Sequence, residues 1–158
     1  MHRYLRFVVL FLVGIFLWSC NSDYVYQEFV DISDAKWAYS DSISFAFDVP
    51  DTNSVYNLYI EIDHSEEFQY QNLYVHIHTT FPQGEKLTEQ VSLQLSDKGF
   101  WVGNCRKGWC KARIMIQSDA YFDQKGIHQF VVEQFTRQNP VNGVQSIGFL
   151  IEDTNQSR

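Results

Sequence analysis

Hydrophobic and polar residues alternate along most of this chain with a period of two rather than 3.6. Such alternation places apolar side chains on one face of an extended strand and polar side chains on the other. It predicts half-buried β-strands and no long amphipathic helix. Seven segments carry the pattern: residues 42–49 (SISFAFDV), 55–63 (VYNLYIEID), 72–81 (NLYVHIHTTF), 89–95 (EQVSLQL), 111–116 (KARIMI), 128–135 (HQFVVEQF) and 146–152 (SIGFLIE).

The segments between these strands are rich in Pro, Gly, Asn and Asp, residues that tolerate turn geometry. They include PDTNS (50–54), FPQGEK (81–86), SDKG (96–99), FDQKG (122–126) and NPVNG (139–143). Many short strands at close spacing favour an all-β fold, an antiparallel β-sandwich of jelly-roll or immunoglobulin-like type with an aromatic-rich core. The polar tail EDTNQSR (152–158) is expected to fray.

The N-terminal segment has the layout of an export signal. Arg3 and Arg6 precede twelve uncharged residues, Phe7 to Trp18, whereas a membrane-spanning helix needs roughly 20. We therefore expect residues 1–19 to be a signal peptide that is removed, and residues 20–158 to form one domain behind a short tether. The four residues LWSC (17–20) resemble the lipobox of bacterial lipoproteins, which implies that Cys20 is lipidated and becomes the first residue. An ordinary signal peptide cut nearby is the alternative.

The composition suits a soluble, acidic domain outside the signal. The full chain is 45% hydrophobic and 16% aromatic, which is ample for a core. Residues 20–158 hold 10 basic and 19 acidic side chains, a formal net charge of −9. A surface for nucleic acid needs clustered Lys and Arg, so this balance argues against that partner.

Two further cysteines, Cys105 and Cys110, form an even pair in an exported protein. Gly108 lies between them and can adopt a positive φ, so the pair could clasp a hairpin as a structural disulfide. A redox-active or metal-binding pair is the alternative. Redox pairs are usually spaced C-x-x-C, and zinc needs more than two ligands, so the structural disulfide is favoured.

His76 and His78 are the candidate metal ligands. Residues i and i+2 of a strand point to the same face, so the two imidazoles could share a metal with a third ligand such as His64 or His128. The same two positions also form the polar face of a half-buried strand, which would make them ordinary surface histidines and leave the protein without a cofactor.

Catalytic motifs are absent from the sequence. It contains no G-x-S-x-G, no G-x-x-x-x-G-K-[ST] and no H-E-x-x-H. The adjacent carboxylates Glu66 and Glu67 lie in the polar segment DHSEEFQ (63–69), which is expected to be a solvated turn. We therefore expect no enzymatic activity, with a metal-dependent enzyme built on the two strand histidines as the remaining possibility.

Large aromatic residues are candidates for an interaction surface, because Trp and Tyr are enriched in the binding hot spots of interfaces. Placement in the core is the alternative for each of them. A row of exposed aromatic rings along one sheet face would instead indicate a carbohydrate-binding sandwich. The candidates are Trp37, Tyr39, Trp101 and Trp109.

A set of short motifs in a fixed order resembles the gliding-motility lipoprotein GldH family of Bacteroidetes, and the resemblance covers nearly all of residues 20–158. The motifs are Tyr56-Asn57-Leu58, Tyr70-x-Asn72-Leu73, Thr80-Phe81-Pro82-x-Gly84, Gly99-x-Trp101-x-Gly103, Glu133-Gln134-x-x-Arg137 and Ile147-Gly148.

The resemblance implies a lipoprotein that is needed for gliding over surfaces and belongs to the machinery linked to type IX protein secretion. It implies a location in the cell envelope, facing the periplasm, with acyl chains on Cys20 in the membrane and other envelope proteins as partners. It brings no enzymatic activity, no cofactor and no defined binding site. Asp23 is the one acid directly after the cysteine, which leaves the choice between inner and outer membrane open.

Overall fold

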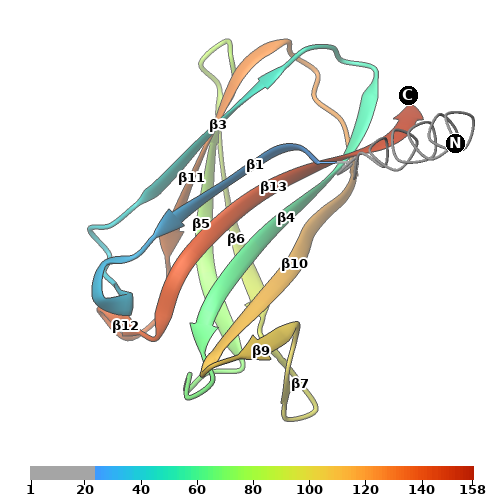
Figure 1. Ribbon diagram of the computed structural model, residues 1–158. Coiled ribbons are helices and arrows are strands. Elements are labelled where there is room, and N and C mark those ends of the chain that lie inside the picture. The colour runs from blue at the N-terminus through green and yellow to red at the C-terminus, as the bar shows by residue number, and fades with distance from the viewer. Residues whose placement is uncertain (1–23) are drawn as a thin grey trace, which may run out of the picture.

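Two antiparallel sheets pack face to face in the computed structural model, which describes residues 24–158 (Figure 1). The five-stranded sheet has the order β1 (Tyr24–Asp31), β13 (Val144–Ser157), β4 (Ser54–Ser65), β10 (Trp109–Ala120) and β9 (Asn104–Arg106). The four-stranded sheet has the order β3 (Ile43–Val49), β11 (Gly126–Gln134), β5 (Asn72–Thr80) and β6 (Lys86–Gln94). The short elements are η2 (Ser33–Ala35), β2 (Lys36–Trp37), β7 (Ser96–Asp97), β8 (Phe100–Trp101) and β12 (Val141–Asn142).

The long strands pair as though one extended hairpin had been wrapped around a core. The first strand, β1, pairs with the last, β13, and β3 pairs with β11. Inside these, β4 pairs with β10, and β5 pairs with β6. This pairing of first with last is the arrangement of a jelly roll. The predicted antiparallel sandwich is confirmed, and the strand order selects the jelly roll over the immunoglobulin-like type.

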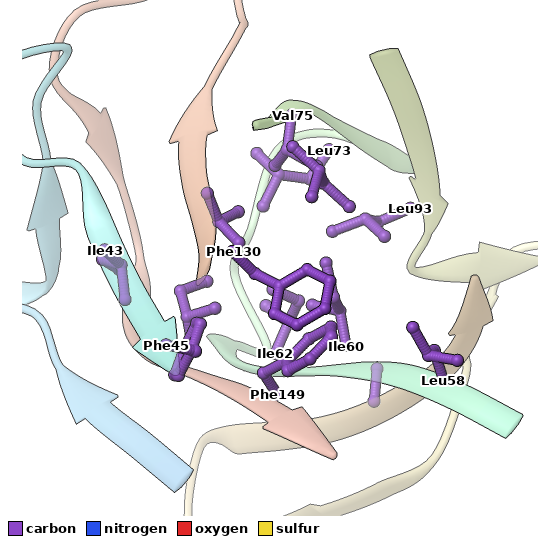
Figure 2. Packing of buried hydrophobic residues seen from close by; sticks show 14 of the residues in the cluster. Ile43, Phe45, Leu58, Ile60, Ile62, Leu73, Val75, Leu93, Phe130 and Phe149 are labelled. Atoms are coloured by element: carbon purple, nitrogen blue, oxygen red, sulfur yellow. The ribbon is translucent and has the colours of Figure 1, made fainter. Parts of the chain in front are cut away.

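The predicted alternation of side chains builds the core. In β3 every second residue is buried, from Ile43 to Val49, and β5 shows the same alternation. Aromatic rings from both sheets meet in the centre: Phe149 of β13 packs against Phe45 and Phe130, with ring centroids 5.6 and 4.7 Å apart (Figure 2). Burial of these rings away from water is the main force holding the two sheets together.

Two parts of the fold differ from the sequence-based expectation. The tail does not fray but continues β13 to Ser157, because its polar groups find partners in strand β4 and in the residue just before that strand. Thr154 Oγ1 donates to the Val55 carbonyl at 2.8 Å, and the Arg158 amide donates to the Asn53 carbonyl at 2.8 Å. The edge strand β1 was not predicted, because it lies half exposed over much of its length and its alternation is weak.

The two ends of the sandwich carry different features (Figure 1). Tyr24 at the start of β1 pairs with Glu152, which pairs with Asn57 near the start of β4. Trp109 of β10 pairs with Ser65 at the other end of β4. Eight residues of strand separate these two levels, which corresponds to roughly 26 Å. We call the end at Tyr24 the proximal end and the end holding β7 to β9 the distal end.

Candidate functional site

Cys20, the predicted site of lipidation, lies outside the described residues. The described chain begins at Tyr24, which is already the first residue of β1. Within residues 24–158 the fold offers no helix long and apolar enough to cross a membrane.

The distal hairpin is closed by a disulfide between Cys105 and Cys110, as the sequence predicts. The two cysteines are directly opposite each other in the β9–β10 ladder. Lys107 and Gly108 form the turn with φ of 56° and 87°, the left-handed conformation that a two-residue hairpin of this type requires. Glu66 lies close to both sulfur atoms, and in residues 24–158 this is the one cluster of three side chains with metal-ligand atoms close together. Because the sulfurs are bonded to each other, the cluster offers no thiolate to a metal.

His76 and His78 lie on the outer face of the four-stranded sheet, and both already have protein partners. The His76 ring stacks on Phe135, with centroids 4.0 Å apart. His78 Nδ1 lies 2.8 Å from Thr88 Oγ1, and its Nε2 lies 3.2 Å from Glu133 Oε2. The two histidine rings are 6.0 Å apart, and no third ligand joins them among the described residues.

His64 and His128, the predicted third ligands, do not reach this pair. Both are fully buried, with Nδ1 against a backbone carbonyl: Ser65 for His64 and Gly126 for His128. His128 lies on the inner face of β11, between Phe81 and Phe122, whereas His76 and His78 lie on the outer face of β5. Burial lowers the pKa of both buried imidazoles below the ordinary value of 6.5.

The four predicted interaction aromatics are not gathered into one surface. Trp37 is fully buried in the core, where its Nε1 donates to the Asp41 carbonyl at 2.7 Å, so its assignment to an interaction surface is wrong. Trp101 is half-buried, packs edge-on against His64 and donates its Nε1 to the Glu66 carbonyl at 3.1 Å.

The other two predicted aromatics are more accessible. Tyr39 is exposed and donates its hydroxyl to the Thr136 carbonyl, while Trp109 is half-buried beside the disulfide. None of the four stacks on another within residues 24–158, so they do not form the row expected of a carbohydrate-binding face. Glu66 and Glu67 lie exposed in a turn, as predicted.

The distal end presents a feature that the sequence reasoning missed. Phe100, in the β7–β8 hairpin, is 78% exposed, more than any other large hydrophobic residue of the described chain. The surrounding residues 96–113 hold five of the ten Lys and Arg side chains of residues 20–158, but only one of their 19 acidic side chains. We call residues 96–113 the distal tip. Its signal in the sequence is this local reversal of charge within an acidic chain.

A second missed feature is a groove on the outer face of the four-stranded sheet, with a volume of about 570 Å³. Three exposed aromatic residues line it: Tyr70, Tyr74 and Phe135. The sequence carries one signal for it, since Tyr74 occupies the polar face of its strand alternation, beside His76.

The fold and the sites together define a jelly-roll β-sandwich with a disulfide-closed distal tip. Residues 24–151 match the GldH lipoprotein family, and the chain belongs to that family. It is 25% identical over 154 residues to the gliding motility lipoprotein GldH homolog of Christiangramia forsetii, covering 92% of this chain and 93% of that protein. It is 23% identical over 152 residues to gliding motility lipoprotein GldH of Flavobacterium johnsoniae, covering 91% and 94%.

Among solved structures, a family GH115 4-O-methyl-α-glucuronidase shows a likeness with a TM-score of 0.44 and 11% identity, covering 86% of this chain and 18% of that protein. That TM-score is too low to support a conclusion about this chain.

Reduction of the Cys105–Cys110 disulfide is expected to lower the free energy of unfolding by about 2 kcal/mol, because closing this short loop removes freedom from the unfolded chain. The melting temperature should fall by roughly 6 °C when dithiothreitol is added to the purified protein. The control is the Cys105→Ala/Cys110→Ala double variant, whose melting temperature the reductant should leave unchanged. An unchanged melting temperature in fully reduced wild-type protein would contradict the prediction.

Acidification is expected to destabilise the protein through His128. Its folded-state pKa is depressed by burial, so below about pH 6.5 the unfolded chain binds a proton that the native state does not. The free energy of unfolding should therefore be fully retained above that pH and decline as the pH falls toward the folded-state pKa, by at most about 1.4 kcal/mol per pH unit for this proton.

Chemical denaturation of wild type and His128→Phe between about pH 7 and pH 5 measures the effect. The variant places a third phenyl ring beside Phe81 and Phe122 and should show the shallower pH dependence. Parallel profiles for the two proteins would show that His128 does not carry the effect.

Proposed function

We propose that this protein is a lipid-anchored, non-enzymatic component of the gliding and type IX secretion machinery, and that it works by contacting other proteins of the cell envelope from the periplasmic side. The family match over residues 24–151 carries this proposal, because it spans almost the whole described sandwich rather than one motif. The names of the two relatives support the role in gliding motility.

In this proposal, anchoring positions the proximal end at the membrane. Cys20 and Tyr24 are four residues apart, and four residues of extended chain reach at most about 14 Å. Because β1 begins at Tyr24, the sandwich has little freedom to move away from its acyl chains. The distal tip then lies at the other end, roughly 26 Å further along β4.

The distal tip is the surface we propose for a protein partner. An exposed phenyl ring with cations in its own hairpin and in the next one suits an acidic surface with an apolar recess, since opposite charges raise the rate of encounter and buried aromatics carry much of the binding energy. Lys98 lies in the turn next to Phe100, whose strand partner is Asp97, while Arg106 and Lys107 lie in the β9–β10 hairpin that the disulfide holds in one shape. A rigid loop loses less entropy on binding than a flexible one.

Replacement of the anchor residue tests the first part of the proposal. A strain that makes only the Cys20→Ser protein should lose surface spreading, because the exported domain is no longer held at the membrane. Colony spreading is measured beside a strain with the wild-type gene, and immunoblots of both confirm equal amounts of exported protein. Normal spreading by the Cys20→Ser strain would refute the need for an anchor.

Replacement of Phe100 tests the distal tip. Phe100→Ser should reduce the yield of crosslinked partner complexes in intact cells roughly tenfold, with reduced spreading, because it removes the apolar centre of the contact. Ile127→Ser is the matched control, since Ile127 is also an exposed apolar residue, at 60%, and lies at the proximal start of β11.

Both variants should melt at the wild-type temperature, since neither side chain belongs to the core. Equal complex yields for Phe100→Ser, Ile127→Ser and wild type would show that the distal tip is not the contact surface.

A further inference from the structure

The outer face of the four-stranded sheet differs chemically from the rest of this acidic protein. On β6 four successive outward residues, Thr88, Gln90, Ser92 and Gln94, are polar and uncharged, and Lys86 lies beyond them at the proximal end. On the neighbouring strand β5 they are opposite, in the same order, His78, His76, Tyr74 and Asn72. The part of the face formed by β5 and β6 therefore presents mainly amides, hydroxyls and rings, whereas the carboxylates Glu133 and Asp48 lie on β11 and β3.

The groove of about 570 Å³ lies at the distal half of this face. Tyr70, Tyr74 and Phe135 are 40%, 41% and 49% exposed, so each ring offers part of its surface to a ligand. Asn72 and Gln90 line the groove beside them and provide amide donors and acceptors. Ligand sites commonly combine aromatic walls with a few placed polar groups in this way.

Two of the three aromatic rings, those of Tyr70 and Phe135, are held in place before any ligand arrives. Tyr70 donates its hydroxyl to Gln138 Oε1 at 2.8 Å and packs edge-on against Phe68. His76 covers one face of the Phe135 ring, and the Phe135 amide donates to the Tyr74 carbonyl at 2.8 Å. Groups that are already fixed lose little conformational entropy on binding, so the groove is preorganised.

Arg137 is the one charged side chain that lines this groove. It is exposed and forms no ion pair with any residue from 24 to 158. A guanidinium binds a carboxylate through two parallel hydrogen bonds, which a neutral ligand does not provide. Because Arg137 has no ion-pair partner among residues 24–158, it favours an anionic ligand locally, against the net negative charge of the protein.

We propose that this groove binds a sugar polymer that carries carboxylates, of the uronic-acid class. The apolar C–H faces of the sugar rings stack on Tyr70, Tyr74 and Phe135, and the hydroxyls bond to Asn72 and Gln90. The carboxylate of one sugar pairs with Arg137. An apolar protein segment fits less well, because amides and a guanidinium lie between the aromatic rings and would lose their water without regaining partners.

The test is isothermal titration of the purified full-length protein with polygalacturonate, with dextran as the neutral polymer and poly-L-glutamate as an acidic polypeptide. Polygalacturonate should bind, and dextran and poly-L-glutamate should bind at least tenfold more weakly. Tyr74→Ala, Phe135→Ala and Arg137→Gln should each weaken binding of polygalacturonate by about tenfold.

Tyr121→Ala is the control variant, because Tyr121 is exposed to a similar degree but lies outside the groove, where its ring contacts Arg158. It should bind polygalacturonate as wild type does, and circular dichroism should show that all four variants are folded. The proposal is overturned if polygalacturonate does not bind, if the three groove variants bind it as well as Tyr121→Ala does, or if dextran or poly-L-glutamate binds equally well.

Discussion

The packing of Phe149 against Phe45 and Phe130 is the contact on which the rest of the structure depends. It joins the five-stranded sheet to the four-stranded sheet through stacked and tilted rings in the centre of the core. Side chains alternate along a strand, so a shift of one residue in any of these strands would send its aromatic ring into water. The contact therefore sets the register of both sheets, and with it the residues that each outer face presents.

The outer faces of the two sheets differ in how their charged groups are paired. On the five-stranded sheet, Glu61 is almost fully buried and accepts hydrogen bonds from Arg113 Nε and Nη2 at 2.8 and 2.6 Å, with Lys111 Nζ at 3.4 Å. These cations compensate a carboxylate that would be costly to bury alone, so the charges of this face neutralise one another. On the four-stranded sheet His78 contacts Glu133, whereas Arg137, which follows β11 and lines the groove, forms no ion pair among residues 24–158.

The sequence predicts the fold well because the alternation of apolar and polar residues indicates only one kind of element, the half-buried strand. A period of two, turn residues at each break and an aromatic-rich composition determine strands, sandwich and core. The errors occur where a partner distant in sequence decides the outcome. Thr154 stays in a strand because the Val55 carbonyl lies beside it, and Trp37 is buried in the short strand that pairs with Val141.

Among the candidate sites, too, some are determined by local sequence and others by residues that are distant in sequence. The disulfide of Cys105 and Cys110 follows from a short local spacing, so the sequence alone predicts it. The groove does not follow from any local spacing. Tyr74 lies in β5 and Phe135 directly follows β11, about 60 residues further along the chain, and only the β5–β11 pairing brings them together. Of the four aromatics predicted instead, Trp37 is packed in the core, Trp101 and Trp109 are half-buried in the distal hairpins, and Tyr39 is exposed.

The distal tip and the rest of the molecule differ in charge, which favours different functions for the two ends. The distal tip is basic, whereas the remainder of residues 20–158 holds 18 of the 19 acidic side chains. At physiological ionic strength charges are screened over about 8 Å, which is well below the roughly 26 Å between the two ends. The acids at the proximal end are therefore too far away to cancel Lys98, Arg106 and Lys107, although Glu66 and Glu67 share the distal end and Lys111 and Arg113 are paired with Glu61. The proposed four-residue tether would hold the opposite end at the membrane.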